Sequence, residues 1–125
     1  MKILIADDHQ IIRHGLKSLL KSIWANAIIL ETDNLNKAVE ILSTTNINLF
    51  VLNIGIPNID VAEGLIGFIA QETKIVIFSG QQGDNERIEN LIKAGADICL
   101  HKNLSVTEIM AIFLSLFDNI RITKS

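Results

Sequence analysis

The sequence predicts a single doubly wound α/β domain, in which a parallel sheet is covered by helices on both faces. Short apolar runs alternate with stretches of helical periodicity along the whole chain, and the central runs are apolar at successive positions. Parallel strands need crossover helices, and strands buried on both faces are apolar throughout. With 125 residues, 49% hydrophobic and 20% charged, the chain suits one core of ordinary size.

Five apolar runs are expected to be strands, and each is followed by a helix. The strands cover residues 2–6, 27–31, a segment centred on 49–52, 74–79 and 97–101. Apolar residues at helical spacing mark the face of each helix that meets the sheet. These residues are Ile12, Leu16, Leu19, Leu20 and Ile23; Leu35, Ala38, Val39 and Leu42; Leu65, Phe68 and Ile69; Ile88, Leu91 and Ile92; and Ile109, Ile112, Phe113, Leu116 and Phe117.

Capping residues indicate where several helices begin and end. Asp33 and Asn34 are expected to begin the second helix, and Asp84 the fourth, because short polar side chains accept hydrogen bonds from a first turn. Gly95 is expected to end the fourth helix. Residues 105–108, Ser-Val-Thr-Glu, have the spacing of a capping box and open the last helix.

Composition excludes several classes of function. A formal net charge of −3 argues against binding of nucleic acid or anionic membrane by this chain alone. The longest apolar run, residues 109–114, is too short to cross a bilayer, so we expect a soluble, cytoplasmic protein. Cys99 is the single cysteine, which excludes an internal disulfide and a thiolate metal site. The sequence has no Walker A, GxGxxG or HExxH motif.

Polar residues follow four of the five predicted strands. Asp7 and Asp8 follow the first, Asn53 the third, Ser79 ends the fourth and Lys102 follows the fifth. In open α/β sheets, ligands bind outside the carboxyl ends of the strands. Two adjacent carboxylates favour a cation such as Mg²⁺ or a lysine ammonium, and hydroxyl and ammonium groups suit a phosphoryl group. The sequence therefore predicts a site that handles phosphoryl groups.

The stretch from residue 7 to 16, Asp-Asp-His-Gln-Ile-Ile-Arg-His-Gly-Leu, resembles the opening of receiver domains in LuxR/NarL-type bacterial response regulators. The likeness extends over nearly the whole chain. It implies a flavodoxin-like (βα)5 fold with strand order 2-1-3-4-5, a receiver domain over residues 1–120, and a tail or linker over 121–125. It also implies that Asp7 and Asp8 bind Mg²⁺ and that Ser79 and Lys102 contact phosphate. The resemblance also places Pro57, four residues after Asn53, where that family has a proline after its phosphoacceptor, which implies the register of the loop after the third strand.

Three residues depart from that family's pattern. Asn53 stands at the phosphoacceptor position, and an amide lacks the anionic oxygen that attacks phosphorus. Loss of that negative charge is expected to weaken or abolish Mg²⁺ binding. Val61 replaces a usual glycine, and Cys99 replaces the aromatic residue of the usual switch. Lys102 is then expected to neutralise Asp7 or Asp8 and to donate to Asn53.

The three histidines and the last helix are further candidates for functional elements. His9, His14 and His101 lack metal-ligand companions at helical or strand spacing, so solvated or capping roles are expected for them. The apolar stripe of the last helix is wider than one core face requires. Its candidates for a dimer or partner surface are Met110, Phe113, Leu114 and Phe117; the alternative is a broad helix that is buried.

These observations predict a receiver domain that no longer accepts phosphate and acts as a phosphorylation-independent interaction module in transcriptional regulation. It is expected not to be an enzyme, to need no cofactor beyond weakly held Mg²⁺, and to reach DNA only through a separate output domain. Phosphotransfer from a histidine kinase is not expected. One alternative is that the natural residue 53 is aspartate and that Asn53 is an engineered block in an active receiver. Another is a small-ligand sensor.

Overall fold

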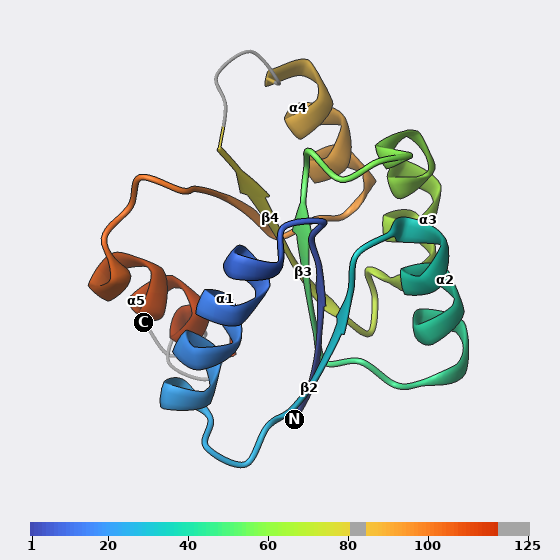
Figure 1. The fold of residues 1–125 in the computed structure, drawn as a ribbon. Coiled ribbons are helices and arrows are strands. Elements are labelled where there is room, and N and C mark those ends of the chain that lie inside the picture. The colour runs from blue at the N-terminus through green and yellow to red at the C-terminus, as the bar shows by residue number, and fades with distance from the viewer. Residues whose placement is uncertain (81–84, 118–125) are drawn as a thin grey trace, which may run out of the picture.

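The computed structural model describes residues 1–80 and 85–117. Strands and helices alternate from one end of the chain to the other (Figure 1). The elements are β1 (Lys2–Ala6), α1 (Gln10–Ile23), β2 (Ile28–Thr32), α2 (Leu35–Thr44), β3 (Leu49–Asn53), the 3-10 turn η1 (Ile59–Val61), α3 (Ala62–Ile69), β4 (Lys74–Ser79), α4 (Asn85–Ala94), β5 (Ile98–His101) and α5 (Val106–Leu116).

The five strands form one parallel sheet in the order β2-β1-β3-β4-β5, which confirms the predicted fold class and strand order. The central strand β3 is buried at all five positions, as expected for a strand covered on both faces. Its last residue, Asn53, lies opposite Phe78 of β4. Because every strand runs the same way, the residues that follow β1, β3, β4 and β5 meet at one edge of the sheet.

Two clusters of buried side chains join the helices to the sheet. On one face, Leu16 and Leu20 of α1 pack with Ile109 and Phe113 of α5. On the other face, the buried residues of the helices come from α2, α3 and α4, and include Leu35, Ile66 and Leu91. Figure 1 shows α1 and α5 on the side of the sheet opposite α2 and α3.

Two predicted strand boundaries differ from the structure by one residue. The second strand is Ile28–Thr32 instead of 27–31, because the Ala27 N–H donates to the Trp24 carbonyl at 3.0 Å while Thr32 still pairs with Ala6. The fifth strand begins at Ile98 instead of residue 97. Asp97 stands just before it, where its carboxylate accepts a hydrogen bond from the Ile75 N–H at 2.7 Å.

The predicted helix caps are present where the structure describes them. The side chain of Asn34 accepts from the Lys37 N–H at 2.8 Å at the start of α2. At the start of α5, Ser105 and Glu108 form both hydrogen bonds of a capping box, each 3.1 Å long. The Ser105 N–H holds the pKa of Glu108 below its usual range, so this contribution to stability is lost as pH falls through that pKa. Asp84, the predicted cap of α4, lies outside the described residues.

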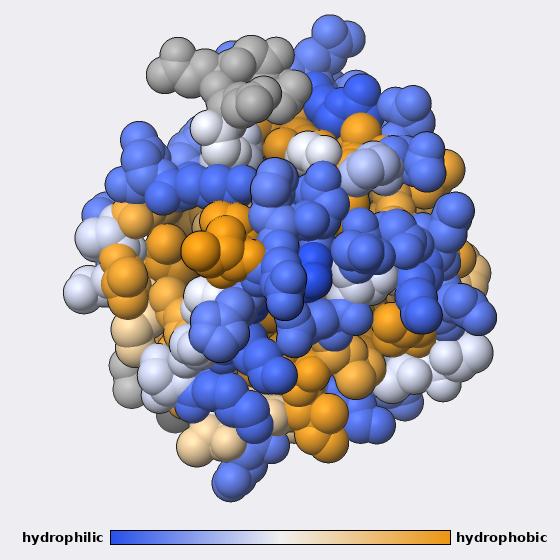
Figure 2. All heavy atoms as spheres, viewed as in Figure 1, coloured by the Kyte–Doolittle hydropathy of each residue, from blue (hydrophilic) through white to orange (hydrophobic). Residues whose placement is uncertain are grey.

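The viewed face of the molecule carries a mixture of polar and apolar residues. Figure 2 shows hydrophilic side chains over much of its centre, with hydrophobic groups in separate patches around them. Large apolar side chains with more than half of their surface exposed include Ile11 on α1, Phe68 on α3 and Val106 at the start of α5. None of the described helices combines the length and the apolar character that a bilayer crossing requires.

Gly95 ends α4 in a backbone conformation that suits glycine alone. Its φ is +132°, and a Cβ at this position would lie 2.5 Å from the Cβ of Ala70. We expect Gly95→Ala to lower the free energy of unfolding by about 1–3 kcal/mol, measured by urea denaturation. The control is Gly15→Ala in α1, where a Cβ meets nothing within 4 Å. It should instead stabilise by about 0.5–1 kcal/mol, and equal effects of the two variants would contradict this explanation.

Candidate functional site

The sequence-predicted site residues come together at the carboxyl-end edge of the sheet. Asp7 directly follows β1, Asn53 and Ser79 are the last residues of β3 and β4, and Lys102 directly follows β5. Asp7, Asn53 and Ser79 are buried, whereas Lys102 is exposed. The topology therefore gathers these residues as expected, but their side-chain contacts differ in part from those that the sequence suggested.

Asp7 is the centre of the hydrogen-bond network at this edge. Only 1% of its surface is exposed, and its Oδ1 accepts from the His9 N–H at 2.8 Å and from Asn53 Nδ2 at 3.2 Å. His9 Nδ1 lies 3.1 Å from the same oxygen. The other oxygen, Oδ2, is buried and has no hydrogen-bond partner among the described residues. A buried carboxylate is costly without partners, so the donors on Oδ1 stabilise it and Oδ2 keeps an unused capacity to bind.

Asn53 uses both ends of its side-chain amide. It is 4% exposed, Nδ2 donates to Asp7, and Oδ1 accepts from the Gly55 N–H at 3.1 Å. The backbone N–H of Gly55 can only donate, which fixes the amide orientation and turns Nδ2 toward the carboxylate. An aspartate in the same place would face Asp7 with a second negative charge instead of a donor. Asparagine is therefore complementary to this edge in the absence of a cation.

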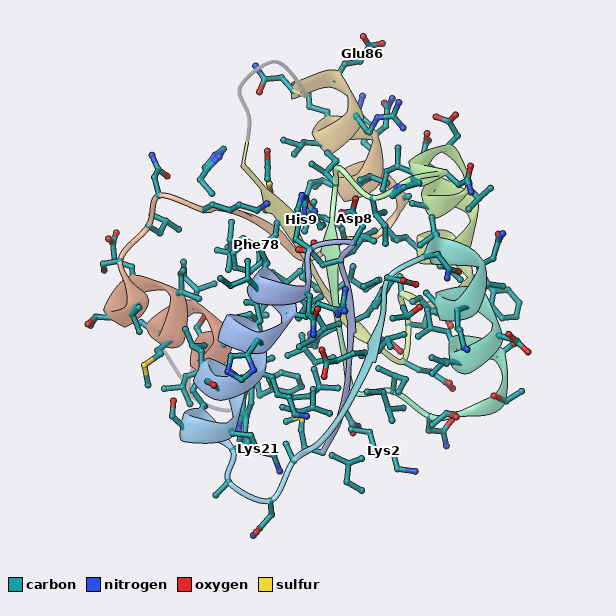
Figure 3. The ribbon with its side chains drawn as sticks, viewed as in Figure 1. Lys2, Asp8, His9, Lys21, Phe78 and Glu86 are labelled. Carbon is teal, nitrogen blue, oxygen red and sulfur yellow. The ribbon has the colours of Figure 1, made fainter. Side chains whose placement is uncertain are left out.

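His9 lies between the two neighbouring carboxylates. Its Nδ1 is 3.1 Å from Asp7 Oδ1 and 3.2 Å from Asp8 Oδ1, and Figure 3 shows Asp8 and His9 together at the end of β1 far from Lys2. His9 has the exposed side chain that a solvated role predicts, at 58%, and stands at the N-cap position of α1, but two carboxylates lie beside it that helical or strand spacing did not indicate. The side chains of residues 7–9 converge because the chain turns there from β1 into α1. In the sequence, the sign of this cluster was that the three residues are consecutive. His14 and His101 are exposed and lie outside this cluster.

Lys102 does not have the contacts that the sequence suggested. No ion pair within 4 Å joins it to Asp7 or Asp8, and no hydrogen bond joins it to Asn53, although the structure describes all four residues. Its side chain instead runs past Gly80, where a Cβ would lie 2.8 Å from Lys102 Cδ and 3.2 Å from Nζ. The bare backbone of Gly80 leaves this path open. Asn53 Nδ2 therefore provides a side-chain donor to the Asp7 carboxylate, and His9 Nδ1 lies 3.1 Å from the same oxygen.

Ser79 and Cys99 occupy the two positions where the resemblance implied switch residues. Ser79 is 1% exposed at the end of β4, and its carbonyl accepts from the Lys102 N–H at 3.1 Å. Cys99 lies in β5 opposite Ile77 and packs against the core on the α2–α4 face. Burial raises the pKa of its thiol, so the thiol stays protonated at neutral pH. Cys99 is therefore a small apolar packing group in this structure.

Arg13 is a member of the site that sequence reasoning missed. Its Nη1 donates to the backbone carbonyl of Asp7 at 2.6 Å, and its Nε contacts Glu31 of β2 at 3.3 Å. The guanidinium thereby ties the first turn of α1 to the ends of β1 and β2. Its position five residues after Asp8 was the available signal.

The four interface candidates on α5 separate into inner and outer positions. Phe113 is fully buried against the core, so its assignment to an interface is wrong. It lies four residues after the buried Ile109, on the face that meets the sheet. Leu114 is 50% and Phe117 36% exposed, and Met110 is half-buried. The Phe117 ring meets Trp24 of α1 edge-to-face, with 5.4 Å between centroids.

Comparison with known proteins places this arrangement in context. The family model for the response regulator receiver domain matches residues 3–114. BvgA, a positive transcription regulator of virulence factors from Bordetella pertussis, is 32% identical over 107 residues, which cover 82% of this chain and 50% of that protein. The Bordetella bronchiseptica protein gives the same values. The chain thus spans about half the length of the curated relatives it matches.

Solved structures agree with this match. A LuxR family DNA-binding response regulator from Silicibacter pomeroyi has a TM-score of 0.74 and 25% identity, covering 89% of this chain and 86% of that one. The signal receiver domain of a DNA-binding response regulator from Colwellia psychrerythraea has a TM-score of 0.79, with 93% and 97% of the two chains covered. At 19% identity, the second likeness shows the fold alone.

The two hydrogen bonds of the buried Asn53 amide are expected to stabilise the fold. Asn53→Ala leaves the Asp7 carboxylate and the Gly55 N–H short of a partner, so the free energy of unfolding should fall by about 1–3 kcal/mol. The control is Asn48→Ala, because exposed Asn48 also accepts from a backbone N–H, that of Lys2, at 2.8 Å. Water can replace that bond, so we expect a loss below about 1 kcal/mol in urea denaturation. Equal losses of unfolding free energy in the two variants would contradict the stabilising role of the buried Asn53 hydrogen bonds.

Proposed function

The chain belongs to the response regulator receiver domain family, and we propose that it signals without phosphorylation at Asn53. The carrying observation is the buried Asn53 amide, which stands at the end of β3 and is hydrogen-bonded to Asp7 and Gly55. Phosphoryl transfer to a side chain needs a nucleophilic atom, and an acyl phosphate forms only from a carboxylate. The amide provides neither, and its oxygen is engaged by the Gly55 N–H.

The neutral amide also sets the resting state of the site. Residue 53 carries a hydrogen-bond donor and not a third carboxylate. No cation is therefore needed to offset charge repulsion between residue 53 and Asp7. The conformation of this site then does not respond to a phosphoryl signal. We propose that the signalling output of the domain depends on expression level, self-association or a bound partner. In this form the domain is an interaction module and not an enzyme.

Magnesium is proposed to bind weakly at most. Oδ2 of Asp7, which is buried and has no hydrogen-bond partner in the described part of the chain, and the 34% exposed carboxylate of Asp8 are oxygen ligands of the kind that Mg²⁺ prefers. Bound there, Mg²⁺ would supply positive charge beside the two carboxylates. Asn53 removes one negative charge from the set, and its oxygen already accepts a hydrogen bond. These residues can hold the ion, but with less charge than three carboxylates would provide.

Transcriptional regulation is the proposed setting. The matched relatives from Bordetella are transcription regulators, and this chain spans about half of their length. The formal net charge of −3 gives the chain no evident means of its own to grip DNA. We therefore propose that DNA is contacted through a separate output domain, and that the protein works in the cytoplasm.

Phosphorylation chemistry tests the proposal directly. After incubation with acetyl phosphate and Mg²⁺, the intact mass of the chain should stay unchanged. The matched variant Asn53→Asp restores a carboxylate beside Asp7, Asp8, Ser79 and Lys102, so it should bind Mg²⁺ more tightly and gain one phosphoryl mass. A stable phosphoryl group on the Asn53 peptide of the unchanged protein would refute the proposal. An inert Asn53→Asp variant would mean that Asn53 alone does not silence the site, and would implicate Val61.

Self-association through α5 is the proposed route of output. Leu114 is half-exposed beside Phe117 and Met110, and the Phe117–Trp24 contact continues this apolar surface toward α1. Aromatic and methionine side chains are enriched at protein interfaces. The α5 surface is thus defined by Met110, Leu114 and Phe117, without the buried Phe113.

Leu114→Arg is expected to weaken a dimer without harming the fold, because Leu114 lies on the outer side of α5. Removing one buried leucine from an interface costs about 1.5–3 kcal/mol, so the dissociation constant should rise at least about tenfold in sedimentation velocity. The control Phe68→Ser changes an apolar residue on α3 that is 84% exposed, and it should leave the dimer intact. A wild-type chain that stays monomeric, or a stronger effect of Phe68→Ser, would contradict this role.

A further inference from the structure

We propose that the groove between α2 and α3 binds a basic amphipathic helix of a partner protein. The groove lies on the face of the sheet opposite α5, away from the surface proposed for self-association. It includes none of the polar residues that meet at the carboxyl-end edge of the sheet. The inference therefore goes beyond the proposed function and does not depend on whether Asn53 blocks phosphorylation.

The α2–α3 groove is a hollow of about 340 Å³ between two neighbouring helices (Figure 1). Its one polar lining residue is Ser43, whose hydroxyl donates to backbone carbonyls of its own helix, those of Val39 and Glu40. All the other lining residues are apolar: Val39, Leu42, Val61, Leu65, Phe68 and Ile69. Of these, Val39 is 38%, Val61 49% and Phe68 84% exposed. Single exposed apolar residues are common, but several that line one hollow mark an interaction site.

The length of the groove suits a helix. Its lining residues beside α3 run from Val61 to Ile69, which corresponds to about 12 Å at a rise of 1.5 Å per residue. Residues at positions i, i+3 or i+4, and i+7 of a helix lie on one face and span about 10.5 Å. Two turns of a partner helix can therefore place three apolar side chains along the groove, which is a common mode of peptide recognition.

The groove continues into a second hollow whose lining is mostly polar. Leu42, Phe68 and Ile69 line both hollows, and Glu72 is the one charged residue that lines the second. The Glu72 carboxylate forms no ion pair within 4 Å with any residue that the structure describes. A lysine or arginine on a helix bound along the groove would therefore meet an unpaired carboxylate at this end.

The segment that carries α2 and α3 has a strong excess of negative charge. From residue 33 to 73, its only basic residue is Lys37. The acidic residues of the same segment are Asp33, Glu40, Asp60, Glu63 and Glu72. Such a surface attracts a helix with basic residues beside its apolar face and repels an acidic helix. The same charge disfavours nucleic acid or an anionic membrane as the occupant.

The occupant is assigned to a partner protein and not to a second copy of this chain. The α5 surface and the α2–α3 groove lie on opposite faces of the sheet, so a dimer through α5 leaves both grooves open. Insertion of the α5 surface of one copy into the groove of another would be a heterologous contact, which extends into rings or filaments. A helix from a partner occupies the groove without that consequence.

Fluorescence anisotropy with three labelled model peptides of equal length tests the site on the full chain. The first contains Leu, Lys and Ala, with Leu at i, i+3, i+4 and i+7 so that one helical face is apolar. The second has the same composition in an order that gives no apolar face, and the third has Glu in place of each Lys. We expect the first peptide to bind with a Kd of about 100 μM or lower, and the other two at least about tenfold more weakly.

Two pairs of variants locate the binding site. Phe68→Ser removes the most exposed apolar side chain of the groove and should weaken binding of the first peptide at least about fivefold. Its control is Ile11→Ser, at an 81% exposed position of α1 on the other face of the sheet, which should stay within about twofold of the wild type. Glu72→Gln should weaken binding at least about threefold at low salt, whereas Glu89→Gln, at an exposed position of α4, should not.

Three results would overturn the site: no binding of the first peptide, equal binding of the first and second peptides, or equal losses in Phe68→Ser and Ile11→Ser. Dissociation of a wild-type dimer by Phe68→Ser in sedimentation velocity would assign the groove to a second copy and would also overturn it. Circular dichroism checks folding, and Val39→Ser on α2 replaces Phe68→Ser if that variant does not fold. A chain that gains a phosphoryl group but binds the first peptide through Phe68 would refute the proposed function and leave this site standing.

Discussion

The edge of the sheet depends on the hydrogen bond that Asn53 Nδ2 donates to Asp7 Oδ1. The Asp7 carboxylate is almost completely buried, and a buried carboxylate requires hydrogen-bond donors. The amide of Asn53 provides one, while its oxygen accepts from the Gly55 N–H. An aspartate at position 53 would remove that hydrogen-bond donor and place a second negative charge beside Asp7. The hydrogen bond that stabilises this edge and the proposed lack of phosphorylation at Asn53 therefore rest on the same amide group.

The architecture was readable from the sequence because it rests on patterns along the chain. The apolar run of β3 predicts a strand covered on both faces, and the Ser105 to Glu108 spacing predicts the start of α5. The exact first residue of β2 could not be predicted from the sequence. Ala27 is apolar like the strand that follows, but its N–H donates to the carbonyl of Trp24 in a turn. Boundaries of this kind depend on hydrogen bonds that the apolar pattern does not encode.

The site was predictable at the level of topology and not at the level of contacts. Polar residues after parallel strands must meet at one edge, which placed Asp7, Asn53 and Ser79 together. The partners of each side chain depend on the local backbone path. Lys102 runs past Gly80, His9 turns back between two acids, and Phe113 points inward although Leu114 beside it does not. Each of these depends on side-chain directions that residue type and spacing leave open.

The interaction between Asn53 and Asp7 can be measured by a double-mutant cycle. The free energy of unfolding is determined for the wild type, Asp7→Ala, Asn53→Ala and the double variant, without added metal. A hydrogen bond to a charged group contributes about 1.5–3 kcal/mol, and we expect a favourable coupling energy in that range. A coupling energy near zero would show that the amide does not hold the Asp7 carboxylate, and would contradict the central role given to Asn53.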